Sequence, residues 1–123
     1  MTTALNGRRL GERALRILLT MVFVGAAVMK LAASEFEVSN FERFGYAPWF
    51  MYAVGIAQLL GAILLWVRGY VGYAALFLAA MMAGGAMSHL SAGDPVAMAI
   101  PALGLTALLC GLAFARRREF ASV

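Results

Sequence analysis

Four long apolar stretches separated by short polar breaks dominate the pattern of the chain. They cover about residues 14–33, 48–67, 70–90 and 95–115. A helix needs about 20 mostly apolar residues to cross about 30 Å of hydrocarbon, and each stretch has about that length. The pattern therefore predicts an all-α integral membrane protein whose single domain, residues 1–123, is an antiparallel bundle of four transmembrane helices.

The polar segment 34–47 separates the first two apolar stretches. Within it, Val38, Phe41 and Phe44 recur every three residues, with charged residues between them. This spacing predicts a short amphipathic helix that lies at the outer membrane interface and caps the bundle. An irregular loop that happens to carry phenylalanines is the alternative.

Composition supports the membrane assignment. Hydrophobic residues make up 63% of the chain and charged residues 13%, against about 45–50% and about 25% in soluble domains. A single cysteine and a single histidine cannot supply a disulfide, a cysteine-based zinc site or a multi-histidine centre. No metal site is therefore predicted, and no motif for haem or flavin is found.

The net charge of +4 suits a membrane topology better than nucleic-acid binding, because the basic residues are unevenly distributed. Eight of them fall at the ends of the predicted spans that share one side of the membrane: Arg8, Arg9, Arg13, Arg16, Arg68, Arg116, Arg117 and Arg118. The positive-inside rule then predicts a multi-pass protein of the cell (inner) membrane with both termini in the cytoplasm.

The N-terminus also has features of a cleaved signal peptide. Arginines precede an apolar run, and the small residues of the segment 32–34 could form a cleavage site. Lys30 interrupts the run just before that site, and cleavage would leave three helices. The first stretch is therefore retained as a transmembrane helix.

Three polar side chains fall within the predicted spans, two of them in the outer third of the membrane and the third beneath them. With a rise of about 1.5 Å per residue, Lys30 lies about 21 Å and His89 about 28 Å from the inner boundary, and Gln58 about 15 Å below the outer one. Simpler explanations exist for each residue. Lys30 can extend toward the headgroups, Gln58 can form an interhelical hydrogen bond, and His89 can cap its helix beside Asp94.

An ionisable group within a membrane is costly, so it marks a candidate site. Convergence of the three side chains would form one polar pocket that opens outward, with Glu35, Glu37 and Asp94 around its mouth. The candidate catalytic residues are Lys30, His89 and Asp94. The candidate ligand-binding residues are Gln58, Glu35, Tyr52 and Trp49.

Rows of small residues predict how the helices pack, since close backbone approach helps to drive helix association in lipid. Residues spaced four apart form the rows Ala57–Gly61, Ala75–Ala79–Ala83, Ala80–Gly84–Ser88 and Ala107–Gly111–Ala115. Pro101 is expected to kink the last helix.

Several segments together resemble the DoxX-like membrane proteins. They are Lys30 at the end of the first span, residues 41–49 (FERFGYAPW), residues 55–62 (GIAQLLGA) and residues 89–95 (HLSAGDP). The resemblance extends from about Ile17 to Ala115 and implies a compact four-helix membrane bundle. Members are named after a subunit associated with quinone-linked oxidation of sulfur compounds, and others are linked to oxidative-stress complexes.

One residue departs from the family pattern. Gln58 occupies a position where the family often carries glutamate. Glutamine cannot exchange protons at ordinary pH, but it can orient a bound carbonyl or quinone oxygen.

Three functional hypotheses follow, and they leave open whether the chain is an enzyme. The first is a redox-associated subunit or enzyme that binds a quinone or another lipophilic small molecule in the outward-facing pocket. The second is a non-redox isomerase or cyclase that acts on an apolar epoxide or isoprenoid. The third is a non-catalytic scaffold subunit. The expected partners are the lipid bilayer, a lipophilic small molecule, a membrane or redox partner protein and a second copy of the chain, but not nucleic acid.

Overall fold

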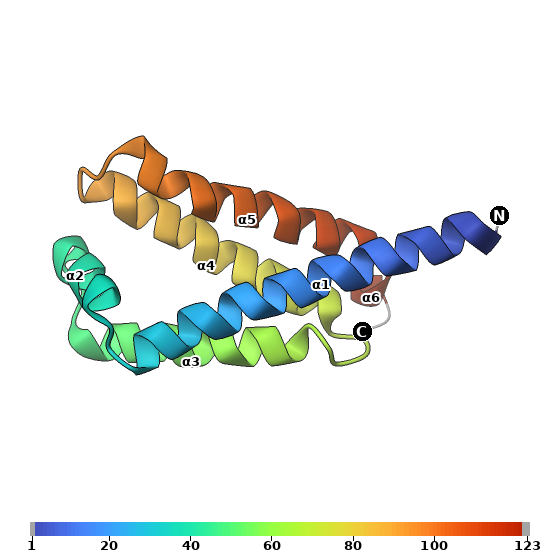
Figure 1. Ribbon diagram of the computed structural model, residues 1–123, viewed down its shortest axis with the longest axis horizontal. Helices are drawn as coiled ribbons and strands as arrows, with labels where there is room; N and C mark the ends of the chain where they lie inside the picture. Colours follow the sequence, from blue (N-terminus) through green and yellow to red (C-terminus); the bar gives the residue numbers. More distant parts are fainter. Residues whose placement is uncertain (1, 122–123) are drawn as a thin grey trace.

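The computed structural model describes residues 2–121, with side chains from residue 7 onward, and this part of the chain is helical without strands. The elements are α1 (Thr2–Leu31), α2 (Glu35–Phe44), α3 (Pro48–Leu64), α4 (Val71–Ser91), α5 (Val96–Ala115) and α6 (Arg118–Ala121). Figure 1 shows that α2 lies at one end of the molecule, while both termini lie at the other.

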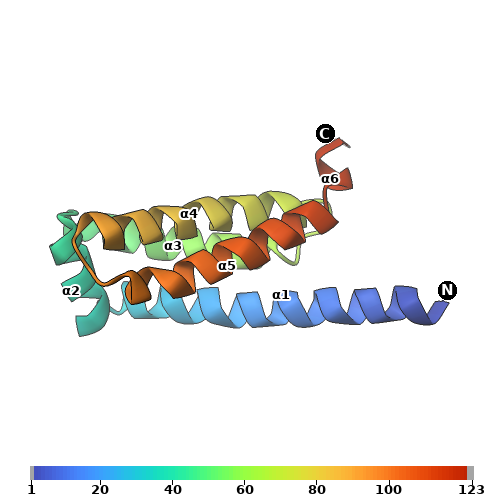
Figure 2. The ribbon, with the colours of Figure 1, turned by 90° about the horizontal axis from the view of Figure 1, so that it is seen from above.

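The helix boundaries agree with the predicted apolar stretches to within about three residues, except at the start of α1. There the basic tail continues the helix back to Thr2, and Figure 2 shows this N-terminal part extending beyond the other helices. Leu64 ends α3 three residues early, before a tight turn in which Gly69 has a positive φ of 86°. Pro101 lies within α5, and the kink expected there stays a prediction.

The segment between the first two long helices is helical, so the loop alternative is wrong. Ser34 begins α2 because its hydroxyl accepts a hydrogen bond from the backbone N–H of Glu37 at 3.4 Å. Gly45 ends the helix in the left-handed conformation, with φ of 81°. Phe41 is buried, as the spacing predicted, but the two polar residues on the same face, Glu37 and Asn40, are buried as well.

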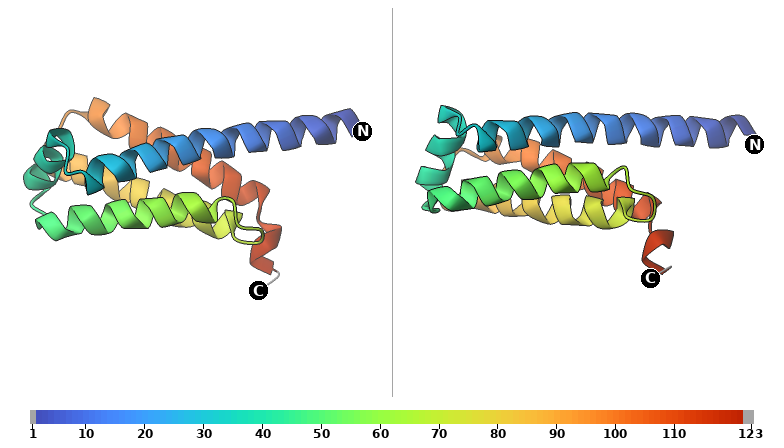
Figure 3. Two further views of the ribbon diagram at one scale, coloured as in Figure 1. Left: turned by 60° about the horizontal axis from the view of Figure 1, so that its bottom comes forward. Right: turned by 90° about the horizontal axis from the view of Figure 1, so that it is seen from below.

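The main interhelical packing joins α1 to α3 and α4 to α5, while α3 and α4 connect the two pairs. Figure 3 shows α2 crossing the end of this arrangement. The core includes Phe23 of α1, Leu65 after α3, Leu78 of α4 and Leu109 of α5, each at most 1% exposed. A Cβ added to Gly61 would lie 2.6 Å from Leu78 Cδ2, so this glycine allows α3 to approach α4 closely.

The small-residue rows agree only in part with this packing. Ala75 and Ala79 of α4 are buried. In contrast, Ala107, Gly111 and Ala115 of α5 are exposed, so this row does not pack within the chain. In a helix rich in alanine and glycine, four-residue spacing occurs on several faces and does not by itself identify the contact face.

Among the residues that the structure describes, three helices are long and apolar enough to cross a membrane: Gly7–Leu31, Val71–Ser91 and Val96–Ala115. A fourth span results only if α2 and α3, which meet at a bend of 117°, are counted as one. The prediction of an all-α membrane protein therefore holds at the level of three to four candidate spans. The complete four-helix transmembrane bundle and the interfacial position of α2 stay predictions.

Away from the arginine-rich end, the outer surface of the long helices is largely apolar. Met21, Ile56, Ile100 and Phe114 come from four different helices, and each is more than half exposed. Such a surface suits contact with lipid tails, because hydrocarbon solvates these side chains as well as a protein core does.

Candidate ligand-binding site

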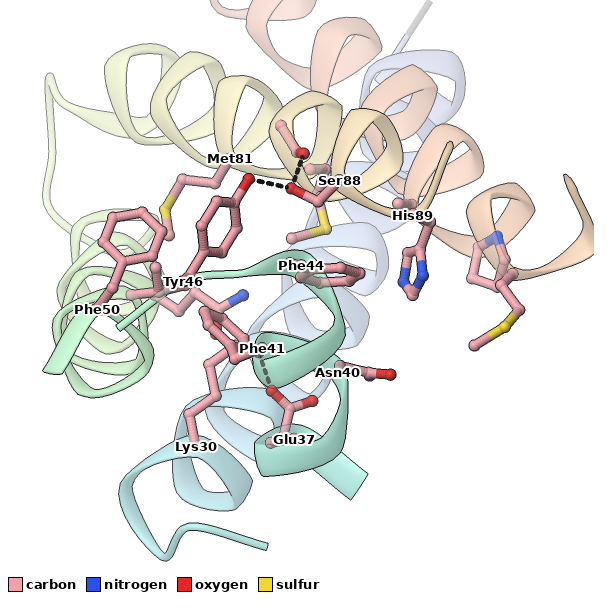
Figure 4. Close-up of a pocket in the computed structure, with 18 of the residues that line it drawn as sticks. Lys30, Glu37, Asn40, Phe41, Phe44, Tyr46, Phe50, Met81, Ser88 and His89 are labelled. Atoms are coloured by element: carbon pink, nitrogen blue, oxygen red, sulfur yellow. Dashed lines mark hydrogen bonds and ion pairs between the residues drawn. The ribbon is translucent and has the colours of Figure 1, made fainter. Parts of the chain in front are cut away.

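A cavity of about 460 Å³ lies beneath α2, between that helix and the facing parts of α1, α3, α4 and α5. Figure 4 shows side chains from these elements pointing into it. Its walls are mostly apolar and include seven phenylalanine and methionine side chains: Phe36, Phe41, Phe44, Phe50, Met81, Met82 and Met98. The volume falls within the range of about 300–1,000 Å³ typical of small-molecule pockets, which are likewise mostly apolar.

Lys30 and Glu37 form a buried ion pair at one end of the cavity. Lys30 Nζ lies 2.8 Å from Glu37 Oε2, and each residue is only 8% exposed. The lysine comes from the last turn of α1 and the glutamate from the first turn of α2. The pair thus fastens α2 to α1 and provides fixed opposite charges at the cavity wall.

Gln58 contributes a hydrogen-bond acceptor that has no partner. It lies on α3, lines the cavity and is 2% exposed. Its Oε1 is buried, and no donor among the described residues bonds to it. Leaving a buried acceptor unsatisfied costs about 1–3 kcal/mol. A molecule that places a hydrogen-bond donor at this position would therefore be bound more tightly than one that does not.

Asp94 joins α2 to the end of α4. Its Oδ2 lies 3.0 Å from Arg43 Nη2 and 2.8 Å from His89 Nδ1, while Arg43 Nη2 also donates to Asn40 Oδ1 at 2.6 Å. The hydrogen bond from Arg43, and then that from His89, lowers the pKa of Asp94. With Nδ1 engaged and the ring edge-on to Phe44, at 5.0 Å between centroids, the imidazole is held at the cavity wall.

A hydrogen-bonded chain connects the α2–α3 loop to α4. Ser88 Oγ donates to the carbonyl of Gly84 at 2.8 Å, so the hydroxyl of Tyr46 donates to Ser88 Oγ at 2.7 Å. All three residues line the cavity, and Figure 4 shows the Tyr46 side chain reaching across to Ser88. This contact fixes an aromatic ring as part of the wall.

Comparison with known proteins identifies the group to which the chain belongs. Residues 14–112 match the DoxX-like family, which covers most of the sequence. The chain is a member of the DoxX-like family. No curated protein and no solved structure matches it.

In this DoxX-like protein, the three polar residues predicted to converge line one cavity. Lys30, Gln58 and His89 come from three different helices. Asp94 lies behind the imidazole of His89, to which it is hydrogen-bonded. The other three predicted ligand-binding residues lie elsewhere: Glu35 is exposed, and Trp49 and Tyr52 are 67% and 41% exposed. Within the described chain, none of these three is part of the cavity lining.

Sequence reasoning missed several polar residues of the DoxX-like cavity. Glu37 was expected only near the mouth of the pocket, and no site role was assigned to Asn40, Tyr46 or Ser88. A signal for the first two exists in the sequence, because Glu37, Asn40 and Phe41 share one helical face. The sequence interpretation of this segment rests on the spacing of Val38, Phe41 and Phe44 and assigns no packing role to the polar residues beside them.

Proposed function

We propose that this DoxX-like protein binds a lipophilic small molecule with a hydrogen-bonding head, of the quinone or quinol class, in the cavity beneath α2. The observation that carries the proposal is the buried, unpaired Oε1 of Gln58 at the wall of a mostly apolar cavity. An apolar ligand body would replace lipid or water among the aromatic and methionine side chains. A hydroxyl on its head would supply the missing donor.

The residues at the polar wall have complementary roles in this proposal. Gln58 accepts from a head-group hydroxyl, whereas the Lys30 ammonium can donate to a head-group carbonyl. A quinone supplies two-electron, two-proton redox chemistry when bound. The chain itself contributes binding and orientation, and an electron-carrying partner protein would complete a redox role.

A topology accompanies the proposal. The helices α1, α3, α4 and α5 would cross an inner membrane, with α2 at its outer interface and the arginine-rich end in the cytoplasm. At about 1.5 Å per residue, the 17 residues of α3 are about 26 Å long, close to the hydrocarbon thickness. The cavity would then lie in the outer half of the membrane, within reach of lipid-soluble ligands.

The contact between His89 and Asp94 favours a second candidate, a non-redox isomerase or cyclase. With Nδ1 held 2.8 Å from the carboxylate, the imidazole has a fixed orientation beside the cavity and can transfer a proton through its other nitrogen. Protonation of an epoxide oxygen followed by loss of a proton from carbon would be such a reaction. Turnover of an apolar epoxide that disappears in a His89→Ala variant would favour this candidate.

Purification in mild detergent, followed by mass spectrometry of retained small molecules and titration with a short-chain quinol, tests the proposal. We expect saturable binding that Gln58→Leu weakens by about tenfold, as loss of one buried hydrogen bond implies. Tyr52→Phe is the matched control, because this exposed side chain lies on the same helix outside the cavity lining. Without ligand, Gln58→Leu should be at least as stable as the unaltered protein, since it removes an unpaired acceptor.

Absence of saturable binding would contradict the proposal, as would equal affinities for the Gln58→Leu and unaltered proteins. A preparation that retains no small molecule but always contains the same second protein would instead support a scaffold role. A mass or absorption band of a different cofactor would change the ligand class.

A further inference from the structure

A second hollow lies at the opposite end of the molecule, near the two termini. It has a volume of about 480 Å³ and is lined by Arg9, Glu12, Arg13, Arg16, Trp66, Arg68, Val71 and Arg116. Five arginines therefore face one carboxylate. We call this hollow the basic cleft, and we propose that it binds a phosphate group, for which an anionic phospholipid headgroup is the favoured source.

The arginines differ in how much of their charge is already paired. Arg116 forms ion pairs with Glu12 and Glu119. In contrast, Arg9, Arg13 and Arg68 are exposed, and no ion pair involving them is found between residues 7 and 121. These three guanidinium groups are available for a ligand, and guanidinium matches the geometry of phosphate oxygens better than any other side chain does.

Arg16 is held in place while its charge is only partly compensated. Its Nη1 donates to the backbone carbonyl of Leu65 at 3.1 Å, and its guanidinium lies 4.6 Å from the ring centroid of Trp66. Its nearest carboxylate, Glu12, is 3.8 Å away and also pairs with Arg116. The buried Arg16 Nε has no hydrogen-bond partner within the described chain, so a positive group is positioned in advance at the cleft wall.

The position of the cleft favours a lipid as the source of the phosphate. Trp66 is an aromatic residue of the kind that marks membrane interfaces, and its indole N–H donates to Thr20 Oγ1 at 2.7 Å. From Arg16 toward Lys30, α1 is almost entirely apolar over about 21 Å. A headgroup in the cleft would therefore have its acyl chains beside apolar helix surface, and basic pockets at this level of a membrane are typical sites for anionic lipids.

The inference is independent of the proposed ligand cavity. Lys30 and Arg16 mark the two sites on the same helix, about 21 Å apart, and no residue lines both. Either site can therefore be empty or absent without affecting the other.

The fluorescence of Trp66 provides a direct assay. The chain has two tryptophans, so Trp49→Phe leaves Trp66 as the sole reporter. The purified full-length protein in neutral detergent is titrated with short-chain phosphatidylglycerol, with phosphatidylcholine of the same chain length, and with glycerol 3-phosphate. We expect a saturable change with phosphatidylglycerol at concentrations where phosphatidylcholine gives none, and weakening as salt is added.

Two neighbouring arginines provide a matched pair of variants. Arg9 lines the cleft, whereas Arg8 is exposed on the same turn of α1 and is not part of the lining. Because one arginine beside an anionic lipid contributes about a fivefold change in affinity, Arg9→Gln should weaken phosphatidylglycerol binding about fivefold. Arg8→Gln, which removes the same charge, should weaken it less than twofold.

Equal responses to the two lipids would overturn the proposal, and so would equal weakening by Arg8→Gln and Arg9→Gln, which would show only a general surface charge. A response to glycerol 3-phosphate that is sensitive to Arg9→Gln, without one to phosphatidylglycerol, would support the phosphate site and assign it to a soluble ligand. Native mass spectrometry of the same variants, with bound lipid masses as the readout, provides a second measurement that does not depend on Trp66.

Discussion

The buried pair formed by Lys30 and Glu37 should be strongly coupled in stability. At the observed separation of 2.8 Å, two unit charges attract each other by about 6 kcal/mol in an effective dielectric of about 20. Desolvation of both groups offsets much of this attraction. Removal of one partner leaves the other buried and unpaired, which typically costs about 3–5 kcal/mol.

A double-mutant cycle measures this coupling. Lys30→Met and Glu37→Leu should each lower the free energy of unfolding by about 3–5 kcal/mol, whereas the double variant should come within about 1–2 kcal/mol of the unaltered protein because no unpaired charge remains. Unfolding in mixed micelles with increasing sodium dodecyl sulfate, followed by circular dichroism, provides the free energies.

Glu35→Gln is the control for this cycle, because Glu35 lies exposed in the same helical turn as Glu37. Its removal should change stability by no more than about 0.5 kcal/mol. If the effects of the two single substitutions simply add in the double variant, the two side chains are not coupled and the reasoning from their burial and distance is refuted.

Two further predictions concern other contacts. Because hydrogen bonds from Arg43 and the neighbouring imidazole lower the pKa of Asp94 below its ordinary value of 3.8, the stabilisation from this carboxylate is fully present above that value. This stabilisation is lost as the pH falls through the lower pKa of Asp94 in the folded protein. The free energy of unfolding of Asp94→Asn, which lacks the titrating carboxylate, should therefore fall less steeply with pH in this range. Identical acid-unfolding profiles of the variant and the unaltered protein would contradict the assignment. Gly61→Ala should destabilise the protein by about 1–3 kcal/mol through overpacking against Leu78. In contrast, Gly104→Ala, in open space on α5, should be neutral or stabilising by up to about 1 kcal/mol. Thermal unfolding in detergent compares the two variants, and an equal effect on stability would show that α3 and α4 adjust freely to the added methyl group.

Much of the fold can be predicted from the sequence, because the length of each apolar run limits where a helix can begin and end. Turn chemistry adds to this, as Ser34 and Gly45 define the ends of α2. The contact face of α5 could not be predicted in this way: the row Ala107–Gly111–Ala115 is exposed, because four-residue spacing alone does not determine which neighbour a helix face meets.

The candidate site, like the fold, can be predicted from the sequence only in part. Distance along each helix predicts how deep Lys30, Gln58 and His89 lie, and in the structure all three line one cavity. The rotation of α2 and of α3 about their own axes does not follow from depth. For that reason Glu37 was placed only near the mouth, and aromatic residues of the α3 end such as Trp49 were given a ligand-binding role although the structure leaves them on the outside.

The two ionic contacts of α2 have a consequence for the kinetics of exchange. Glu37 attaches the helix to α1, and Arg43 attaches it to Asp94 between α4 and α5. Six residues, or about 9 Å of helix, separate these attachments, so α2 bridges the two helix pairs whose separation sets the width of the cavity. A molecule that entered or left the cavity by separation of the two helix pairs would have to break at least one of these contacts, and its residence time would then depend on their strength as well as on its own affinity.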